Sequence, residues 1–384
     1  MKHKRVVVGL SGGVDSAVSA FLLKKAGYDV VGVHLVCWPP VSERIKSQEL
    51  RIKNGCKADE DRKSALKTAL ELEIPFKVLD YSEEYNQKVV DYFYHEYEIG
   101  RTPNPDILCN SEIKFGLFLQ WALENGFDYI ATGHYAKIEF CHCEEKSDEA
   151  IYMDRHVGVP SRDDEDVKLF IPSDKHKDLT YFLWKLRQKE LQHVLFPLGD
   201  LLKSEVRKIA QDNKLSVAQR PDSQGICFVG EVNVRDFLKK RLKEKPGNVL
   251  DSNGKIIGKH KGMWFYTIGQ RGGWEVMPKI QKTLGDLEPM YVISKDVKKN
   301  ELVVGTKKEG ERNSFCVTNF TLIDESAITM VRIRHCGELV NASVNKLDKK
   351  LFVETEKEMF GIAPGQSAVF YSDEGQCLGG GMIE

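Results

Sequence analysis

The run Ser11-Gly12-Gly13-Val14-Asp15-Ser16 constrains this chain more than any other feature. A β-branched apolar run at 6–8 precedes it, and residues 17–26 repeat apolar side chains at helical spacing. The sequence therefore predicts a strand, a tight loop and a helix. A Ser-Gly-Gly triplet alone is equally typical of a surface turn. After a buried strand, the glycines favour a loop whose backbone N–H groups close on a phosphate at the helix N-terminus.

The side chains of the same run fit this interpretation. Ser11 and Ser16 add hydroxyl donors, and the Asp15 carboxylate is expected to hold Mg²⁺ against the phosphates. No G-x-x-x-x-G-K-[ST] motif occurs, which excludes a Walker-type ATPase. The pattern resembles the PP-loop pyrophosphatase family, whose members cleave ATP between the α- and β-phosphates and adenylate a carbonyl or carboxyl oxygen.

Composition indicates a cytoplasmic protein. The chain has 384 residues, long enough for two or three domains, and nine cysteines, an odd number with no disulfide-framework spacing. The apolar run after the basic N-terminus stops at Leu10, too short for a signal peptide or a membrane span. Cys141-His142-Cys143 hints at a metal, but no second pair accompanies it, so no metal site is expected.

Positive charge is concentrated in one segment. Residues 230–312 contain eighteen Lys or Arg and eleven Asp or Glu, a local charge of +7, whereas the whole chain carries −1. A local basic surface suits a structured nucleic acid, and the alternative is a solvated lysine-rich face. We therefore expect a structured nucleic acid as a partner, and no membrane.

Alternating patterns predict an α/β fold with a parallel sheet, with ligands at the carboxyl ends of the strands. Later turn signals at hairpin spacing predict a small antiparallel β-barrel. We expect a PP-loop domain over 1–212 with a charged insertion at about 141–167, a central domain over 213–284 and the barrel over 285–384. The expected strands are 30–36, 76–79, 128–131, 167–171, 291–294, 301–304 and 368–371, and the expected helices are 59–72, 83–98, 181–191, one capped by Ser204, and 234–242.

Two prolines, Pro103 and Pro105, interrupt the pattern after residue 100. They predict a rigid loop that holds Asp106 and Cys109 at the start of a helix beginning near Ser111. A helix N-terminus favours a thiolate, so Cys109 is a candidate nucleophile, and the alternative is a buried structural cysteine.

Two further positions carry weaker signals. Gly133 follows the strand at 128–131 and permits close approach to a nucleotide, and His134 beside it is a substrate contact or a structural histidine. Cys227 follows polar turn residues and is expected on a loop or a strand edge.

Together these motifs resemble the tRNA-specific 2-thiouridylases, the bacterial MnmA family, nearly from end to end. The resemblance rests on Ser11 to Ser16, Gly100 to Asn110, Ala131-Thr132-Gly133-His134-Tyr135, Asp222-Ser223-Gln224-Gly225-Ile226-Cys227-Phe228, Tyr266-Thr267-Ile268-Gly269-Gln270-Arg271 and Cys377-Leu378-Gly379-Gly380-Gly381. It implies ATP-dependent sulfur transfer to C2 of the wobble uridine of tRNA, so the nucleic-acid partner that it implies is tRNA and not DNA. By similarity, Cys227 carries a persulfide, Cys109 is the partner nucleophile and Asp106 the acid–base group, and a cysteine desulfurase or a sulfur-relay protein is the sulfur donor.

The resemblance also implies three sets of binding residues. The ATP site would be lined by Gly9, Leu10, Ser11, Gly12, Gly13, Val14, Asp15, Ser16, Leu35 and Gly133. The target base would be surrounded by Asn104, Pro105 and Asp106. tRNA would be contacted by His134, Lys177, Asp178, Leu179, Arg334, His335 and Gln366.

The chain departs from the family pattern at three places. Leu179 replaces a usual glutamine, Leu35 a common methionine, and Gly272-Gly273 the usual Lys-Gly. These changes leave the ATP chemistry intact and allow a paralogue with altered RNA preference. Two other classes stay open: a PP-loop ligase of small molecules, which needs no cysteines, and an RNA-binding protein without catalysis.

Overall fold

The computed structural model describes residues 4–38, 57–140, 166–222, 233–278, 288–323 and 328–384. The chain forms two compact units. Unit 1 comprises Met1–Val89, Asp106–Glu231 and Glu374–Leu378, and unit 2 comprises Val90–Pro105, Val232–Asp373 and Gly379–Glu384. Within the described part of the chain, no helix combines the length and the apolar composition needed to cross a membrane.

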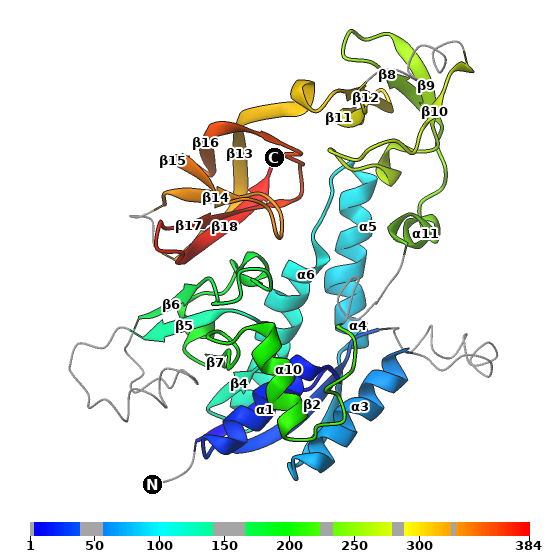
Figure 1. Ribbon diagram of the computed structural model, residues 1–384. Helices are drawn as coiled ribbons and strands as arrows, with labels where there is room; N and C mark the ends of the chain where they lie inside the picture. Colours follow the sequence, from blue (N-terminus) through cyan, green and yellow to red (C-terminus); the bar gives the residue numbers. More distant parts are fainter. Residues whose placement is uncertain (1–3, 39–56, 141–165, 223–232, 279–287, 324–327) are drawn as a thin grey trace, which may run out of the picture. The chain divides into compact units, whose positions relative to one another are not determined.

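Unit 1 is built on a five-stranded sheet in the order β3-β2-β1-β4-β7, and every pairing in it is parallel (Figure 1). Val6, Val7 and Val8 of the central strand are fully buried, as expected for a parallel strand covered on both faces. The predicted parallel α/β fold is confirmed. The strands are β1 (Arg5–Gly9), β2 (Asp29–Val36), β3 (Phe76–Asp80), β4 (Tyr129–Ala131) and β7 (Val194–Leu195).

Helices α1 and α10 pack on one face of this sheet. Val18 of α1 and Val206 of α10 share a core cluster with Val6 and Val8 of β1. Because the chain runs from β1 outward to β2 and β3 on one side and to β4 and β7 on the other, β1 and β4 form a topological switch point, where α/β sheets bind ligands. The longer helices are α1 (Val14–Lys25), α3 (Lys57–Glu71), α7 (Phe118–Glu124) and α10 (Lys203–Asp212).

The rest of unit 1 consists of short elements. One predicted helix, 181–191, is wrong: the chain forms a 3₁₀ turn, η3 (Thr180–Phe182), and a single-turn helix, α9 (Gln188–Leu191). Leu183, Trp184 and Leu186 are all buried, so the apolar residues point to more than one side and provide no single helical face. The other short elements are α4 (Ser82–Tyr85), the π-helical η1 (Asn86–Val90), which runs into unit 2, and the antiparallel pair β5 (Lys137–Phe140) and β6 (Val167–Phe170).

Unit 2 joins segments that are far apart in the sequence. Helix α5 (Asp91–Glu98) packs on α11 (Val234–Lys239): the rings of Tyr94 and Phe237 stack with centroids 5.2 Å apart, and the Tyr94 hydroxyl donates to Phe237 O over 2.7 Å. Beside them lies the sheet β10-β9-β8-β12-β11. It consists of β8 (Gly247–Leu250), β9 (Ile256–His260), β10 (Glu275–Val276), β11 (Tyr291–Asp296) and β12 (Glu301–Gly305), and the 3₁₀ turn η4 (Met263–Phe265) follows β9.

The C-terminal part of unit 2 is a closed barrel, β13-β16-β15-β14-β17-β18, drawn in orange and red in Figure 1. Closure removes unpaired edge strands, and the predicted antiparallel barrel is confirmed. The expected strands 291–294 and 301–304 belong instead to the five-stranded sheet, because β12 pairs in parallel with β8. After the 3₁₀ turn η5 (Lys308–Gly310), the barrel strands are β13 (Glu311–Leu322), β14 (Met330–Arg332), β15 (Val340–Leu347), β16 (Lys350–Phe360), β17 (Ser367–Tyr371) and β18 (Cys377–Ile383).

Candidate functional site

The loop between β1 and α1 is closed by its own serine hydroxyls. The Ser11 backbone N–H donates to Ser16 Oγ over 3.2 Å, and the Gly13 N–H donates to Ser11 Oγ over 3.3 Å. Gly12 has φ of 85°, in the left-handed region that favours glycine. The loop thus brings small side chains and the N-terminus of α1 together, which is the geometry expected of a phosphate cradle.

The backbone at Gly12 is fixed by neighbouring elements. Its carbonyl oxygen accepts from Arg220 Nη1 over 2.5 Å and from Ser64 Oγ of α3 over 2.8 Å. Arg220 is also paired with Asp61 of α3. A Cβ at position 12 would collide with the carbonyl oxygen of Asp61, so the site requires glycine for space as well as for backbone conformation.

Residues predicted to line the nucleotide site come together at the carboxyl ends of three strands. A Cβ at Gly133, after β4, would lie only 2.7 Å from the backbone nitrogen of Ser16, so glycine permits this close approach. Leu10, directly after β1, and Leu35, in β2, are both buried. Between these strands the His34 ring bonds to Leu10 O through Nδ1 over 2.8 Å. Gly9 ends β1, and Val14 begins α1.

The Asp15 carboxylate is held by two side chains. Lys203 Nζ, at the start of α10, donates to Oδ1 over 2.7 Å and to Oδ2 over 2.8 Å. The Tyr135 hydroxyl donates to Oδ1 over 2.8 Å. Burial and the neighbouring Asp15 carboxylate raise the pKa of Tyr135 well above its usual range, so this hydroxyl keeps its proton and remains a donor.

A second carboxylate, Asp222, forms ion pairs with three cationic side chains. Lys177 Nζ lies 2.6 Å, Lys203 Nζ 2.9 Å and Arg207 Nη2 2.6 Å from its oxygens. Partial burial acts to raise the pKa of Asp222, but the ammonium groups of Lys177 and Lys203 outweigh it and lower this pKa to about 2. With Asp15, the cluster holds three cations and two anions. Its net positive charge beside the phosphate cradle suits a polyphosphate.

This arrangement does not fit Mg²⁺ bound directly by Asp15, because both carboxylate oxygens already contact the Lys203 ammonium. Among the residues that the structure describes, no group of three or more His, Cys, Asp or Glu side chains could hold a metal ion. Asp15 therefore orients Lys203 in this structure rather than presenting a magnesium ligand. Cys141 and Cys143 lie outside the described residues.

Sequence reasoning missed Lys203, Arg207 and Arg220 as site residues. Lys203 and Arg207 are four positions apart, so they share one face of α10, and this spacing was the one available signal. Their partner Asp15 is distant in the sequence, and Asp222 follows α10 beyond a loop, so only the fold reveals the ion pairs.

His134, a predicted tRNA contact, has aromatic neighbours. Its ring centroid lies 5.7 Å from that of Phe115 and 6.1 Å from that of Phe196, and its Nδ1 bonds to Thr132 Oγ1 over 2.7 Å. Burial, followed by the charge of Lys114, lowers the pKa of His134 well below its usual value. The ring is therefore neutral at pH 7, which favours the structural interpretation.

The predicted RNA contacts at 177–179 also have other partners. Asp178 is buried and accepts from Thr180 N over 2.9 Å and from Thr180 Oγ1 over 2.6 Å. Leu179 N donates to Tyr135 O over 3.0 Å. The Leu179–Tyr135 bond and the Lys177–Asp222 pair attach the segment to the cluster around Asp15.

The helix that contains Cys109 begins earlier in the sequence than expected. Instead of starting near Ser111, a helical run extends from Pro105 through α6 (Pro105–Leu108) and a π-helix, η2 (Cys109–Leu117), into α7. The predicted boundary is wrong because proline is favoured in a first helical turn, where its missing N–H costs no hydrogen bond.

This shift moves Cys109 away from the helix N-terminus, so the helix dipole favours its thiolate less than predicted. Cys109 is fully buried, whereas Asp106, in the first turn, is half-buried. Cys227 lies outside the described residues.

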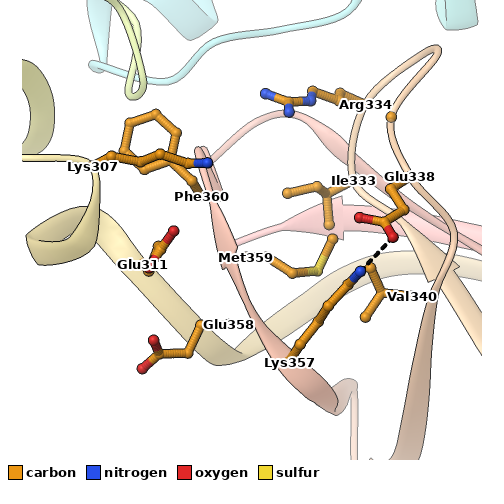
Figure 2. Close-up of a pocket in the computed structure, with 11 residues that line it drawn as sticks. Lys307, Glu311, Ile333, Arg334, Glu338, Val340, Lys357, Glu358, Met359 and Phe360 are labelled. Carbon is orange, nitrogen blue, oxygen red and sulfur yellow. Dashed lines mark hydrogen bonds and ion pairs between the residues drawn. The ribbon is translucent and has the colours of Figure 1, made fainter.

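In unit 2, Arg334 borders a cavity of about 160 Å³ in the barrel. Figure 2 shows the charged ends of Arg334 and Lys307 pointing toward one another, beside the Phe360 ring. Glu338 on the same wall is paired with Lys357. Glu311 and Glu358 also line the cavity, so its wall carries charges of both signs.

The other candidates of unit 2 lie on the barrel and on the segment before α6. His335 Nε2 is 3.1 Å from Cys336 Sγ in the turn after β14. Gln366 Nε2 donates to Thr102 O over 2.8 Å and contacts Pro103 O at 3.4 Å. Asn104 and Pro105, which follow directly, are half-buried.

A parallel sheet with a glycine loop at its switch point is typical of phosphate-binding α/β domains. A family model described as "tRNA methyl transferase HUP domain" matches residues 4–231. Two more follow it: "tRNA methyl transferase PRC-barrel domain" at 235–306 and "Aminomethyltransferase beta-barrel domain" at 310–383.

The sequence similarity to curated relatives extends over the whole chain. A tRNA-specific 2-thiouridylase MnmA of Lysinibacillus sphaericus is 38% identical over 391 residues, covering 99% of this chain and 94% of its own. One of Geobacillus kaustophilus, MnmA 1, is 39% identical over 393 residues, covering 100% and 96%. A solved 4-thiouridine synthetase–RNA complex with bound ATP reaches 15% identity and a TM-score of only 0.32, over 62% of this chain and 50% of its own. The chain belongs to the MnmA family of tRNA-specific 2-thiouridylases.

Proposed function

We propose that this protein uses ATP to replace O2 of the wobble uridine of tRNA with sulfur, giving 2-thiouridine. The observation that carries the proposal is the glycine loop at the switch point of the parallel sheet, in a chain similar over its full length to 2-thiouridylases. A uridine C2 oxygen is a poor leaving group, so it must first be activated as an adenylate, and a phosphate cradle serves that step.

In the activation step, the Ser11–Ser16 loop and α1 bind the phosphates of ATP. The uridine O2 attacks the α-phosphorus, and pyrophosphate leaves. The Lys203 ammonium, fixed between Asp15 and Asp222, supplies positive charge beside the cradle. Mg²⁺ bound to ATP would supply charge neutralisation at the phosphates, and the chain's own groups orient the nucleotide.

In the sulfur step, the outer sulfur of a Cys227 persulfide attacks C2, and AMP leaves with the former O2. The Cys109 thiolate then attacks Cys227 Sγ, so a Cys109–Cys227 disulfide forms and the thiocarbonyl is released. An external thiol reductant supplies the two electrons that restore both thiols. Asp106, in the first turn of α6, is the candidate acid–base group for these proton transfers.

Several groups of residues would bind the RNA. Asn104, Pro105 and Asp106 would surround the target base. Arg334 and Lys307, on either side of the barrel cavity, offer paired cations to an RNA phosphate. A cysteine desulfurase or a sulfur-relay protein would load Cys227, and we place the reaction in the cytoplasm, where thiols stay reduced.

Cysteine substitution tests this function. We expect Cys109→Ser and Cys227→Ser each to abolish 2-thiouridine in tRNA hydrolysates analysed by mass spectrometry, because each removes one sulfur of the relay. ATP–pyrophosphate exchange in the presence of tRNA should persist in both variants, since the phosphate cradle is intact. Cys316→Ser, on barrel strand β13, is the matched control and should thiolate normally.

Two results would contradict the proposal. Full thiolation by either variant would remove the two-cysteine mechanism. Pyrophosphate release that needs no tRNA and is insensitive to alkylating reagents would instead indicate a ligase of small molecules.

A further inference from the structure

The segment 100–103, which leads into the predicted base-binding residues, is held by other parts of unit 2. Lys295 of β11 donates to Gly100 O over 3.1 Å, just after the end of α5. The Thr102 and Thr267 hydroxyls are 3.4 Å apart. The segment is therefore fixed at two points, by strand β11 and by the turn between η4 and β10.

The barrel holds the same segment more tightly. The Thr102 N–H donates to Pro364 O over 2.8 Å, and the Gln366 side-chain amide donates to Thr102 O over 2.8 Å. Both backbone groups of Thr102 are thus bound by one barrel turn. The same amide nitrogen lies 3.4 Å from Pro103 O, which extends the contact by one residue.

Gly365 allows this close contact. It has φ of 91°, and a Cβ there would lie 2.9 Å from Thr102 N and 2.9 Å from Arg101 Cβ. The turn is itself anchored, because Gly365 N donates to Ile383 O over 2.9 Å and Ile383 N donates to Gln366 O over 2.8 Å. Gln366 therefore extends from a rigid base.

Solvent exposure changes along the segment. Thr102 and Pro103 are buried, whereas Asn104 and Pro105 are half-buried. The part that Gln366 holds is thus inaccessible to a large ligand, and the part that follows is partly accessible. A Gln366 amide that donates to these backbone carbonyls is oriented toward the protein chain.

We propose that Gln366 is a positioning residue: it fixes the backbone of Thr102 and Pro103 and thereby sets where Asn104 and Pro105 meet the target base. This inference rests on the proposed thiolation. It differs from the role implied by family resemblance, in which Gln366 contacts tRNA. A base held about 1 Å from its productive position reacts up to about 100-fold more slowly.

The test compares full-length Gln366→Ala and Gln366→Glu with Arg334→Gln, a variant of the predicted phosphate contact on the same barrel. For each we would measure the tRNA dissociation constant, the single-turnover thiolation rate, and hydrogen exchange of the backbone amides at 99–105.

Gln366→Ala should slow thiolation about 10- to 100-fold, leave the dissociation constant within about twofold, and speed exchange at Thr102. Gln366→Glu should be worse than Gln366→Ala, since a carboxylate would face carbonyl oxygens. Arg334→Gln should show the reverse, with weaker tRNA binding and unchanged exchange.

Three outcomes would overturn the inference. Weaker tRNA binding by Gln366→Ala with unchanged exchange at Thr102 would make Gln366 an RNA contact. Faster exchange throughout β17 and β18 would reduce its role to barrel stability, and an unchanged thiolation rate would remove it from the reaction. If the wild-type protein itself fails to thiolate tRNA, the proposed function fails, whereas the exchange at Thr102 still reports whether Gln366 holds the segment.

Discussion

At the scale of single residues, the phosphate cradle depends on charges that the sequence motif does not contain. The motif supplies Asp15, but the fold places Lys203 against both oxygens of that carboxylate and joins it to Asp222. The side chain of Lys203 is only 15% exposed, so its ion pairs are weakly screened by solvent. One half-buried ammonium thus links Asp15 of the glycine loop to Asp222, more than two hundred positions away in the sequence.

Replacing Lys203 should therefore weaken nucleotide binding. Lys203→Met removes the net positive charge of the cluster and a charge-assisted contact worth roughly 1.5–3 kcal/mol. We expect ATP affinity to fall by at least about tenfold, measured by equilibrium binding. Lys208→Met is the control, because Lys208 is exposed on the same helix. Equal affinity in the two variants would remove Lys203 from the nucleotide site.

A buried histidine in unit 2 should make stability depend on pH. His260 Nε2 donates to Asn300 O over 3.0 Å, and the Gly262 N–H donates to His260 Nδ1 over 3.1 Å. In the neutral ring one nitrogen donates a hydrogen bond and the other accepts one. Burial lowers the pKa of His260 below its usual value of 6.5. The unfolded chain therefore takes up a proton before the folded chain does, so stability is full above about pH 6.5 and is lost as the pH falls further.

Thermal unfolding at pH 7.5 and at pH 5.5 would measure this effect. The loss of stability on acidification should be smaller in His260→Asn than in the wild-type protein. His176→Asn, at an exposed position, should retain the full loss. Identical pH dependence in all three proteins would show that His260 does not titrate on unfolding.

At the scale of elements, Cys109 is the first residue of the π-helix η2. Each backbone hydrogen bond of a π-helix spans five residues instead of the four of an α-helix, and such segments are frequent at functional sites. Gly116 permits this geometry: a Cβ there would lie 2.7 Å from Ser111 O, the carbonyl five residues earlier. Glycine propensity and helical periodicity in the sequence gave no sign of the change in spacing.

Gly116→Ala should disturb this spacing and rotate Cys109 relative to the rest of unit 1. We expect thiolation, measured as 2-thiouridine per tRNA, to fall at least about tenfold, while ATP binding stays within about twofold because the cradle lies on other elements. Gln120→Ala, exposed on α7, is the control. Normal thiolation by Gly116→Ala would show that the π-helical spacing is dispensable.

Element boundaries also show where sequence reasoning is limited. The strand, glycine loop and helix at the N-terminus were predictable because local pattern and tertiary role agree there. The start of α6 was not, since Pro105 could either break a helix or begin one. The pairing of β12 with β8 was not predictable either, because parallel strands distant in the sequence leave no hairpin signal.

At the scale of the whole molecule, the sequence predicted the fold class and the barrel but not which segments join. Hydrophobic periodicity identifies an element and does not name its partner. Helix α5 lies between PP-loop elements in the sequence, yet it belongs to unit 2, where Tyr94 stacks on Phe237. Because periodicity does not identify partners, the sequence also did not predict the ion pairs of Lys203 or the contact of Gln366 with Thr102.

The β5–β6 pair has a consequence for how the chain can vary in length. Phe140 and Val167 face each other in register at the end of this pair, and Val167 is fully buried. The two strand ends are therefore held side by side at an anchored position. A flexible reporter sequence spliced between them would begin and end at neighbouring points of the same ladder, so doubling the length of such an insert would cost only about 0.6 kcal/mol of closure entropy.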